Sequence, residues 1–191
     1  LGLPVTSTTK VFLSHLHADH VGDMPTLLWS LAKAGRRDPV EVWGPAGEDE
    51  HLGTLAYAQH LEAAHAWDMK SLNGHPGQSG ARAITTEVPY DRPEVVYQRN
   101  GVTITSFPVI HIHNGAVGYR LDYAGRSVVF SGDTRPCRTL VDASDDVAAT
   151  FAVALELLSA RSSPVAAVLR ATRPPAAPTG RCRRRHWCAA S

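Results

Sequence analysis

Short apolar runs alternate with an amphipathic segment in the first part of the chain. Residues 10–14 (KVFLS) form a run of strand-forming residues that stops at a polar cluster, and residues 40–43 (VEVW) form a second run. Between them, apolar residues recur at the spacing of one helix face: Met24, Leu27, Leu28 and Leu31. We expect Asp23 to cap this helix, Pro25 to lie in its first turn and Gly35 to end it.

The pattern then predicts a second helical stretch over residues 48–70. Residues 71–93, rich in Gly, Pro and polar residues, are predicted to form a surface excursion. The order strand, helix, strand, helix is typical of an α/β fold.

Strand patterns return in the second half of the chain. We predict strands over residues 102–109, 117–122 and 127–131, the last two joined as a hairpin through residues 123–126. Residues 147–159 are predicted to form the last helix. The fold class is therefore α/β, with strands predominating in this half.

A cluster of polar side chains fills the loop after the first predicted strand. The loop sequence is SHLHADHVG, and it offers four candidate metal ligands within six residues: His15, His17, Asp19 and His20. Imidazole and carboxylate are the ligands zinc prefers when no thiolate is offered. The alternative is a polar surface loop with coincidental histidines. In such a loop, His15 and His17 can point to one side and Asp19 and His20 to another, which favours two adjacent ions over one.

Two later stretches complete a pattern with this loop. Residues 107–111 (FPVIH) end a predicted strand in a histidine, and residues 131–134 (SGDT) follow the strand VVF. Taken together, the three motifs resemble the metallo-β-lactamase superfamily over roughly residues 3 to 146. The sequences GYR at 118–120 and SGDT are similar to the ribonuclease Z branch and its arylsulfatase-like relatives. The resemblance implies an αββα sandwich.

The resemblance also implies a site with one or two Zn²⁺ ions. A first zinc would be held by His15, His17 and His111, and a second by Asp19 and His20, with Asp133 bridging the two ions. Asp19 would also orient the attacking water, which makes it the catalytic residue of the set. His113 is the alternative to His111, because side chains two residues apart on a strand face the same side. We favour His111 because its Val-x-His position matches the family motif.

The chain departs from the family pattern at both ends. Only 14 residues precede His15, where family members carry β-structure, so we expect the sandwich to be incomplete. Members of the ribonuclease Z branch supply a further histidine late in the chain. After Asp133 this chain has only His186, within the sequence RRRHW. We therefore expect the second zinc site to be weak or empty, and the sequence to be atypical after about residue 147.

Charge divides the chain into two parts. All 18 acidic residues and 12 of the 19 Lys and Arg lie in residues 1–156, which gives a net charge of −6, whereas the remaining residues carry +7. We assign residues 1–160 to the metallo-β-lactamase-like domain and residues 161–191 to a disordered, basic, Pro/Arg-rich tail. A nucleic-acid-binding arm and a shifted reading frame are the alternatives for this tail.

The resemblance implies a zinc-dependent hydrolase, specifically a phosphodiesterase similar to ribonuclease Z that acts on RNA. The alternatives are a metal-binding but inactive fragment, or a hydrolase of a small ester, sulfate ester or lactam. His51 and His60 are interpreted as surface residues. No apolar run is long enough to span a membrane, so we expect no membrane partner and a cytoplasmic location. The expected partners are RNA or a small-molecule substrate, and a homodimer is left open.

Overall fold

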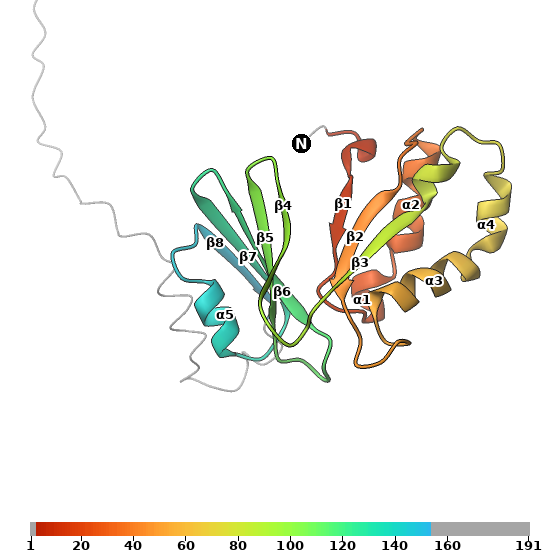
Figure 1. The fold of residues 1–191 in the computed structure, drawn as a ribbon. Coiled ribbons are helices and arrows are strands. Elements are labelled where there is room, and N and C mark those ends of the chain that lie inside the picture. Colours follow the sequence, from red (N-terminus) through yellow and green to blue (C-terminus); the bar gives the residue numbers. More distant parts are fainter. Residues whose placement is uncertain (1–2, 154–191) are drawn as a thin grey trace, which may run out of the picture.

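The computed structural model describes residues 3–153, which form two β-sheets packed face to face with helices on the outer sides (Figure 1). The first sheet has three parallel strands in the order β1 (Lys10–Phe12), β2 (Val40–Pro45) and β3 (Ala83–Val88). The second sheet has five strands in the order β4 (Glu94–Arg99), β5 (Val102–Pro108), β6 (Val117–Tyr123), β7 (Arg126–Asp133) and β8 (Ala149–Val153). All its neighbouring pairs are antiparallel except β7 and β8.

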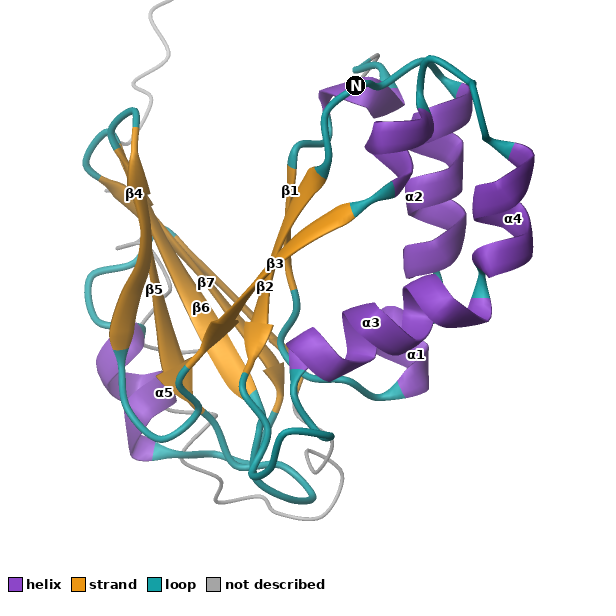
Figure 2. Cartoon of the chain, turned by 45° about the vertical axis from the view of Figure 1, so that its right-hand side comes forward, coloured by secondary structure: helices purple, strands orange, loops and turns teal. Residues whose placement is uncertain are grey.

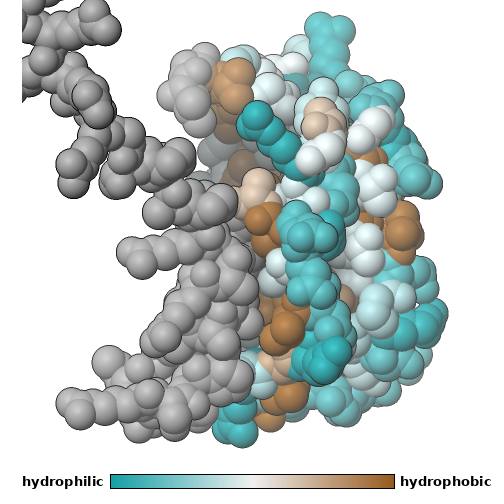
Figure 3. Space-filling model, turned by 90° about the vertical axis from the view of Figure 1, so that its left-hand side faces the viewer, coloured by the Kyte–Doolittle hydropathy of each residue, from teal (hydrophilic) through white to brown (hydrophobic). Residues whose placement is uncertain are grey.

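Helices cover each sheet from outside. The first sheet is flanked by α1 (Ala18–Val21), α2 (Met24–Lys33), α3 (Thr54–Ala64) and α4 (Ala66–Ser71), and the second by α5 (Arg138–Ala143) (Figure 2). The side of the molecule that carries α5 shows hydrophobic residues interspersed with hydrophilic ones (Figure 3). This arrangement is the predicted αββα sandwich.

Aromatic side chains join the two sheets. Phe12 of β1 stacks on Trp43 of β2, with ring centroids 4.8 Å apart, and meets Tyr119 of β6 edge to face at 5.5 Å. Tyr97 of β4 contacts both Phe12 and Trp43. Large rings supply much apolar area per residue, so these four hold the short strand β1 against the second sheet.

Helix α2 packs its predicted face on the first sheet. Leu28 and Leu31 are buried against Val40 and Val42 of β2. The helix ends as predicted at Gly35, whose φ of 89° suits glycine. Asp23 is the N-cap residue, as predicted, but its side chain makes no capping hydrogen bond.

The predicted helix over residues 48–70 is shorter and interrupted. Residues 48–53 form turns, α3 begins at Thr54, and the backbone of His65 separates α3 from α4 with φ −105° and ψ 21°. The predicted excursion over residues 71–93 is also partly wrong, since it contains β3, which pairs in parallel with β2. Strand β3 lies at the edge of its sheet and is largely exposed, so its sequence lacks a buried apolar run.

Two hairpins organise the second sheet. The predicted one joins β6 and β7 through Ala124 and Gly125, which both have positive φ, as a two-residue turn of type I′ requires. The other joins β4 and β5 through Asn100 and Gly101, also with positive φ, and was not predicted. Asn-Gly is the commonest sequence for such a turn, so the signal was present.

The last predicted helix is wrong over its described part. Residues Ala149–Val153 form β8, which pairs in parallel with β7. The rest of that prediction, the domain boundary at residue 160 and the basic tail over 161–191 lie outside the described residues. Within residues 3–153, no helix is both long and apolar enough to cross a membrane.

Arg120 ties the second sheet to the end of α5. Its Nε donates to both carboxylate oxygens of Asp122, and Nη2 donates to Ser127 Oγ at 3.0 Å. Nη1 donates to the carbonyl oxygens of Ala143 and Asp145, each at 3.0 Å. Arg120 is therefore a structural clamp, with its donors directed at the protein itself.

Candidate metal centre

The loop that follows β1 is fixed to both sheets where it begins. Leu13 N donates to Trp43 O at 2.7 Å, and Tyr119 Oη donates to Leu13 O at 2.8 Å. Val117 N donates to Ser14 O at 2.9 Å. These bonds hold the start of the histidine-rich loop in place, so the side chains that follow emerge at a defined end of the sandwich, beside α1 (Figure 2).

Three histidines converge there from two distant segments. His15 Nε2 lies 3.1 Å from His17 Nδ1, and His111 Nε2 lies 3.1 Å from the same His17 nitrogen. One ring nitrogen of each residue lies within 4.8 Å of the other two. His15 is only 4% exposed. The structure thus brings together the three residues predicted for the first zinc.

A second group shares His15 and adds His20 and Asp133. His20 Nε2 lies 3.5 Å from Asp133 Oδ1. Asp133 is 7% exposed, and its Oδ1 accepts no hydrogen bond from the described residues. A buried carboxylate oxygen without a hydrogen-bond donor is costly unless a cation compensates it.

His15 can serve only one of these two groups through Nε2. Its Nδ1 lies 3.1 Å from Ser14 Oγ, so that nitrogen is already hydrogen-bonded. Asp19, predicted as a ligand and as the catalytic residue, is outside both groups. Its side chain is 80% exposed, and Oδ2 lies 3.6 Å from His20 Nε2. The second group therefore has fewer ligands of its own than the first.

The ends of β5 and β7 are joined where they deliver His111 and Asp133. Arg135 N donates to Ile110 O at 2.7 Å, and Ile110 N donates to Thr134 Oγ1 at 3.1 Å. These two bonds lie next to the candidate ligands in sequence. They explain why residues 22 positions apart in the chain reach the same site.

Gly132 permits the close approach of β7 to the histidine-rich loop. Its φ is +58°, and a Cβ on this residue would lie 2.6 Å from Ser14 Cβ. Any larger residue would push Asp133 away from His15 and His20.

The crowding of imidazoles disfavours protonation within the cluster. Burial, with the neighbouring rings of His20, His111 and His17, lowers the pKa of His15 to about 4, while Asp133 acts in the opposite direction. Burial is also the main cause that lowers the pKa of His111, followed by His17. Neutral imidazoles have a free lone pair, which is the form that binds a metal.

The ligand spacing fits a tetrahedral metal ion. Zn–N bonds of ~2.0 to 2.1 Å in tetrahedral geometry place ligand nitrogens roughly 3.3 to 3.4 Å apart. The two distances of 3.1 Å to His17 Nδ1 are close to this value. Both hydrogen bonds compete for one nitrogen, whereas an ion between the rings would satisfy all three. The donor set and the unsatisfied Asp133 oxygen therefore fit a divalent cation.

A cavity of about 330 Å³ opens beside the first group. His15, His17 and His111 line one part of it. The other lining residues come from the histidine-rich loop, from the turn before α3, from α3 itself and from the loop before β6: Leu16, His51, Leu52, Gly53, Tyr57, His60, His113, Asn114, Gly115 and Ala116. His51 and His60 are exposed, as the sequence predicts, and they also line this cavity.

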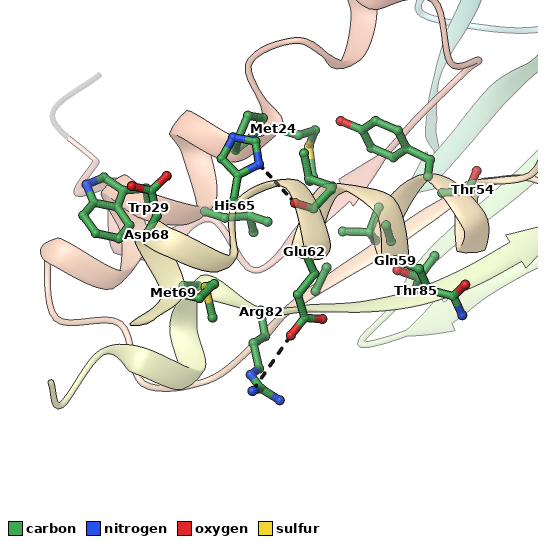
Figure 4. A pocket seen from close by; sticks show the side chains of 18 of the residues that line it. Met24, Trp29, Thr54, Gln59, Glu62, His65, Asp68, Met69, Arg82 and Thr85 are labelled. Carbon is green, nitrogen blue, oxygen red and sulfur yellow. Dashed lines mark hydrogen bonds and ion pairs between the residues drawn. The ribbon is translucent and has the colours of Figure 1, made fainter. Parts of the chain in front are cut away.

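A second cavity, of about 170 Å³, lies between α2, α3, α4 and the first sheet (Figure 4). It is mainly apolar, with Glu62 and Arg82 paired at 3.9 Å and His65 Nδ1 3.0 Å from Leu61 O. No residue of the two candidate metal groups lines it.

The remaining histidine alternatives differ in position. His113 lies outside both groups, with its Nδ1 3.0 Å from Asn114 O, and its ring centroid is 6.3 Å from that of His17. His186 lies outside the described residues. Ser14 and Gly132 support the site but were not predicted to do so, because each acts through proximity to a segment distant in sequence.

Comparisons of the chain with a family model and with known relatives agree on one family. Residues 4–157 match the family model described as a β-lactamase superfamily domain. The chain is 34% identical over 148 residues to a ribonuclease Z of Mycobacterium avium, covering 73% of this chain and 49% of that protein. It is 27% identical over 169 residues to a ribonuclease Z of Methanosarcina acetivorans, covering 73% of this chain and 55% of that protein. The chain spans about half the length of the curated relatives it matches.

Solved structures share the fold at low sequence identity. Human tRNase Z, short form (ELAC1), is 17% identical, with a TM-score of 0.55 over 78% of this chain and 58% of that one. The metallo-β-lactamase fold protein YhfI of Bacillus subtilis is 16% identical, with a TM-score of 0.51 over 78% and 50%.

Proposed function

The chain belongs to the β-lactamase superfamily, and on this basis we propose that it is a zinc-dependent hydrolase that cleaves phosphodiesters, with RNA as its substrate class. The observation that carries the proposal is the convergence of His15, His17 and His111 around a point beside the buried, unsatisfied oxygen of Asp133. Such a cluster of neutral imidazoles and a carboxylate is costly for folding alone. It suits a metal centre that opens into a cavity.

The ligand roles follow from the two groups. His15, His17 and His111 would hold the first ion, and His20 and Asp133 would hold a second. When bound, zinc supplies a Lewis acid that activates water and polarises the oxygen of the scissile group.

The remaining roles belong to groups around the ligands. Ser14 fixes the ring of His15 through Nδ1, so Nε2 is directed to the ion. Asp19, exposed next to His20, would orient the attacking water and accept its proton.

RNA as substrate rests on similarity. The curated relatives named above are ribonuclease Z proteins, and one of the structural neighbours is a tRNase Z. The fold alone does not select a substrate, so the identity of the relatives carries this part of the proposal.

A second candidate function is metal binding without catalysis. It is favoured by the second group, in which His15 is shared with the first and Asp19 lies outside. A site that holds only the first ion would lack the partner ion that a two-metal reaction uses.

Metal analysis and a hydrolysis assay on the full chain test both functions. After dialysis we expect close to one tightly bound zinc equivalent and hydrolysis of bis(p-nitrophenyl) phosphate that rises with added zinc. His17→Ala should abolish both, and the matched control His75→Ala should keep both, since His75 lies in neither metal group. Tight zinc with no hydrolysis at any zinc concentration would favour the second candidate. No bound zinc would overturn the proposal.

A further inference from the structure

The 330 Å³ cavity that His15, His17 and His111 line is also lined by further imidazoles. His51 lies in the turn before α3, and His60 lies on α3. Neither belongs to the two candidate metal groups. Within residues 3–153, the ring of His60 makes no hydrogen bond or ion pair, and the His51 ring has only Glu50 at 3.7 Å. Both rings therefore have donors to offer to a molecule in the cavity.

Helix α3 is fixed so that it presents His60 to the site. Tyr57 Oη donates to Val21 O at 2.9 Å, which joins α3 to the short helix α1 of the histidine-rich loop. Tyr57 and His60 are three residues apart, so they lie on the same helix face. Leu55 N donates to Glu87 Oε1 at 2.9 Å, which holds the beginning of the helix against β3. Contacts with α1 and β3 thus fix the position of α3, which carries His60.

The charge of the cavity favours an anion. Among the described residues that line it, none is Asp or Glu, whereas six are histidines and one is Asn114. The acidic residues of the turn before α3 do not line the cavity, but they contact residues that do. Glu48 accepts from Asn114 Nδ2, and Asp49 accepts from His51 N at 2.8 Å. The cavity therefore offers hydrogen-bond donors next to the metal groups, with no acidic residue in its lining.

We propose that His51 and His60 are substrate-binding residues that donate hydrogen bonds to the anionic phosphoryl oxygens of a phosphodiester, bound in the same cavity that His15, His17 and His111 line. This inference rests on the proposed function and specifies which group of the substrate the cavity holds. A volume of about 330 Å³ is at the low end for small-molecule sites, so the cavity admits a single nucleotide-sized group. His51 and His60 are thus specificity residues, distinct from the metal ligands.

Inorganic phosphate is the probe that tests this assignment, with the zinc-loaded full chain in a calorimeter. We expect the double variant H51A/H60A to bind phosphate about tenfold or more weakly, because hydrogen bonds to a charged group are lost. H51Q/H60Q, which keeps an amide donor at each position, should recover part of the affinity. The matched control is His65→Gln, since His65 lies just beyond the end of α3 and lines the other cavity (Figure 4).

A second measurement uses bis(p-nitrophenyl) phosphate. In the double variant KM should rise about tenfold, with zinc content and circular dichroism equal to those of the parent chain. Equal phosphate affinity in parent and double variant, or no phosphate binding by the parent, would overturn the inference. If phosphate binding depends on His51 and His60 but no phosphodiester is hydrolysed, the inference stands and the proposed function fails.

Discussion

Gly132 and Ser14 lie so close that a Cβ on the glycine would be 2.6 Å from the Cβ of the serine. The contact joins the end of β7 to the loop after β1, which are more than a hundred residues apart in sequence. Because Asp133 follows Gly132 and His15 follows Ser14, this approach sets the spacing between two candidate metal ligands.

Gly132→Ala should therefore harm stability and metal binding together. We expect a loss of about 2 to 4 kcal/mol in the free energy of unfolding, from the clash and from the positive φ. Urea denaturation measures the free energy of unfolding, and zinc titration measures the metal affinity. Gly125→Ala is the control, because Gly125 also has positive φ but no atom within 4 Å of its Cβ. It should cost only about 1 kcal/mol, with zinc affinity unchanged. Equal losses for the two variants would show that the contact with Ser14 is unimportant.

His111→Ala and His113→Ala should differ sharply in zinc affinity. Removing His111 should weaken zinc affinity more than about 100-fold. Loss of a residue that only hydrogen-bonds a metal ligand already costs about 10- to 100-fold in affinity. Removing His113, which is exposed and outside both groups, should leave it within about twofold of the parent. Competition with a chromophoric chelator measures both. A loss confined to His113→Ala would transfer the ligand role to that residue.

The metal-free chain should lose stability in mild acid. Burial and the neighbouring imidazoles lower the pKa of His15 from 6.5 to about 4, so the folded chain binds fewer protons than the unfolded chain between these values. The free energy of unfolding should thus fall as pH drops from about 6.5 to 4, by up to about 3 kcal/mol. Urea denaturation in EDTA at several pH values measures the slope.

His15→Gln should flatten that slope, because the group with the lowered pKa is gone. His75→Gln should leave it as in the parent, as His75 lies in a loop outside the cluster. A parent chain with equal stability at pH 7 and pH 4.5 would contradict the expected proton linkage.

Arg120→Ala should destabilise the second sheet by about 2 to 3 kcal/mol. The substitution removes the donors to Asp122, Ser127 and the carbonyl oxygens after α5, and leaves Asp122 half-buried without its partner. Thermal unfolding of the zinc-loaded chain measures the loss. Arg138→Ala, which removes an exposed ion pair with Asp142, should cost less than about 0.5 kcal/mol.

Local patterns predicted the parts of the fold whose signals lie close together in sequence. The helix over Met24–Lys33 and the hairpin at Ala124 and Gly125 are specified by residues within a few positions of one another. Strand β3 escaped prediction because it lies at a sheet edge and exposes Ile84, so no apolar run marks it. Strand β8 escaped because a short apolar run such as ATFAV fits a helix or a strand, and pairing with β7 decides between them.

The residues of the candidate site were also predictable only where their signals lie close together in sequence. The spacing of His15, His17 and His20 was visible in the sequence because the ligands are neighbours. The cavity wall with His51 and His60 was not, because those residues reach the site only through the docking of α3 on α1. No local sequence pattern distinguishes Gly132 from other glycines, because its close contact is with Ser14, which is distant in sequence.

The hydrogen bond between His17 and His111 spans 94 positions in the chain. An ion held by both residues would close a loop of that length, as a covalent cross-link does. If the ion stayed bound to both histidines in the unfolded chain, it would reduce the conformational entropy of that state. Because the unfolded chain keeps only the nearby histidines together, the ion would instead be released when the two sheets separate. Zinc release should then follow the same time course as unfolding, which makes the ion a kinetic reporter of sandwich opening.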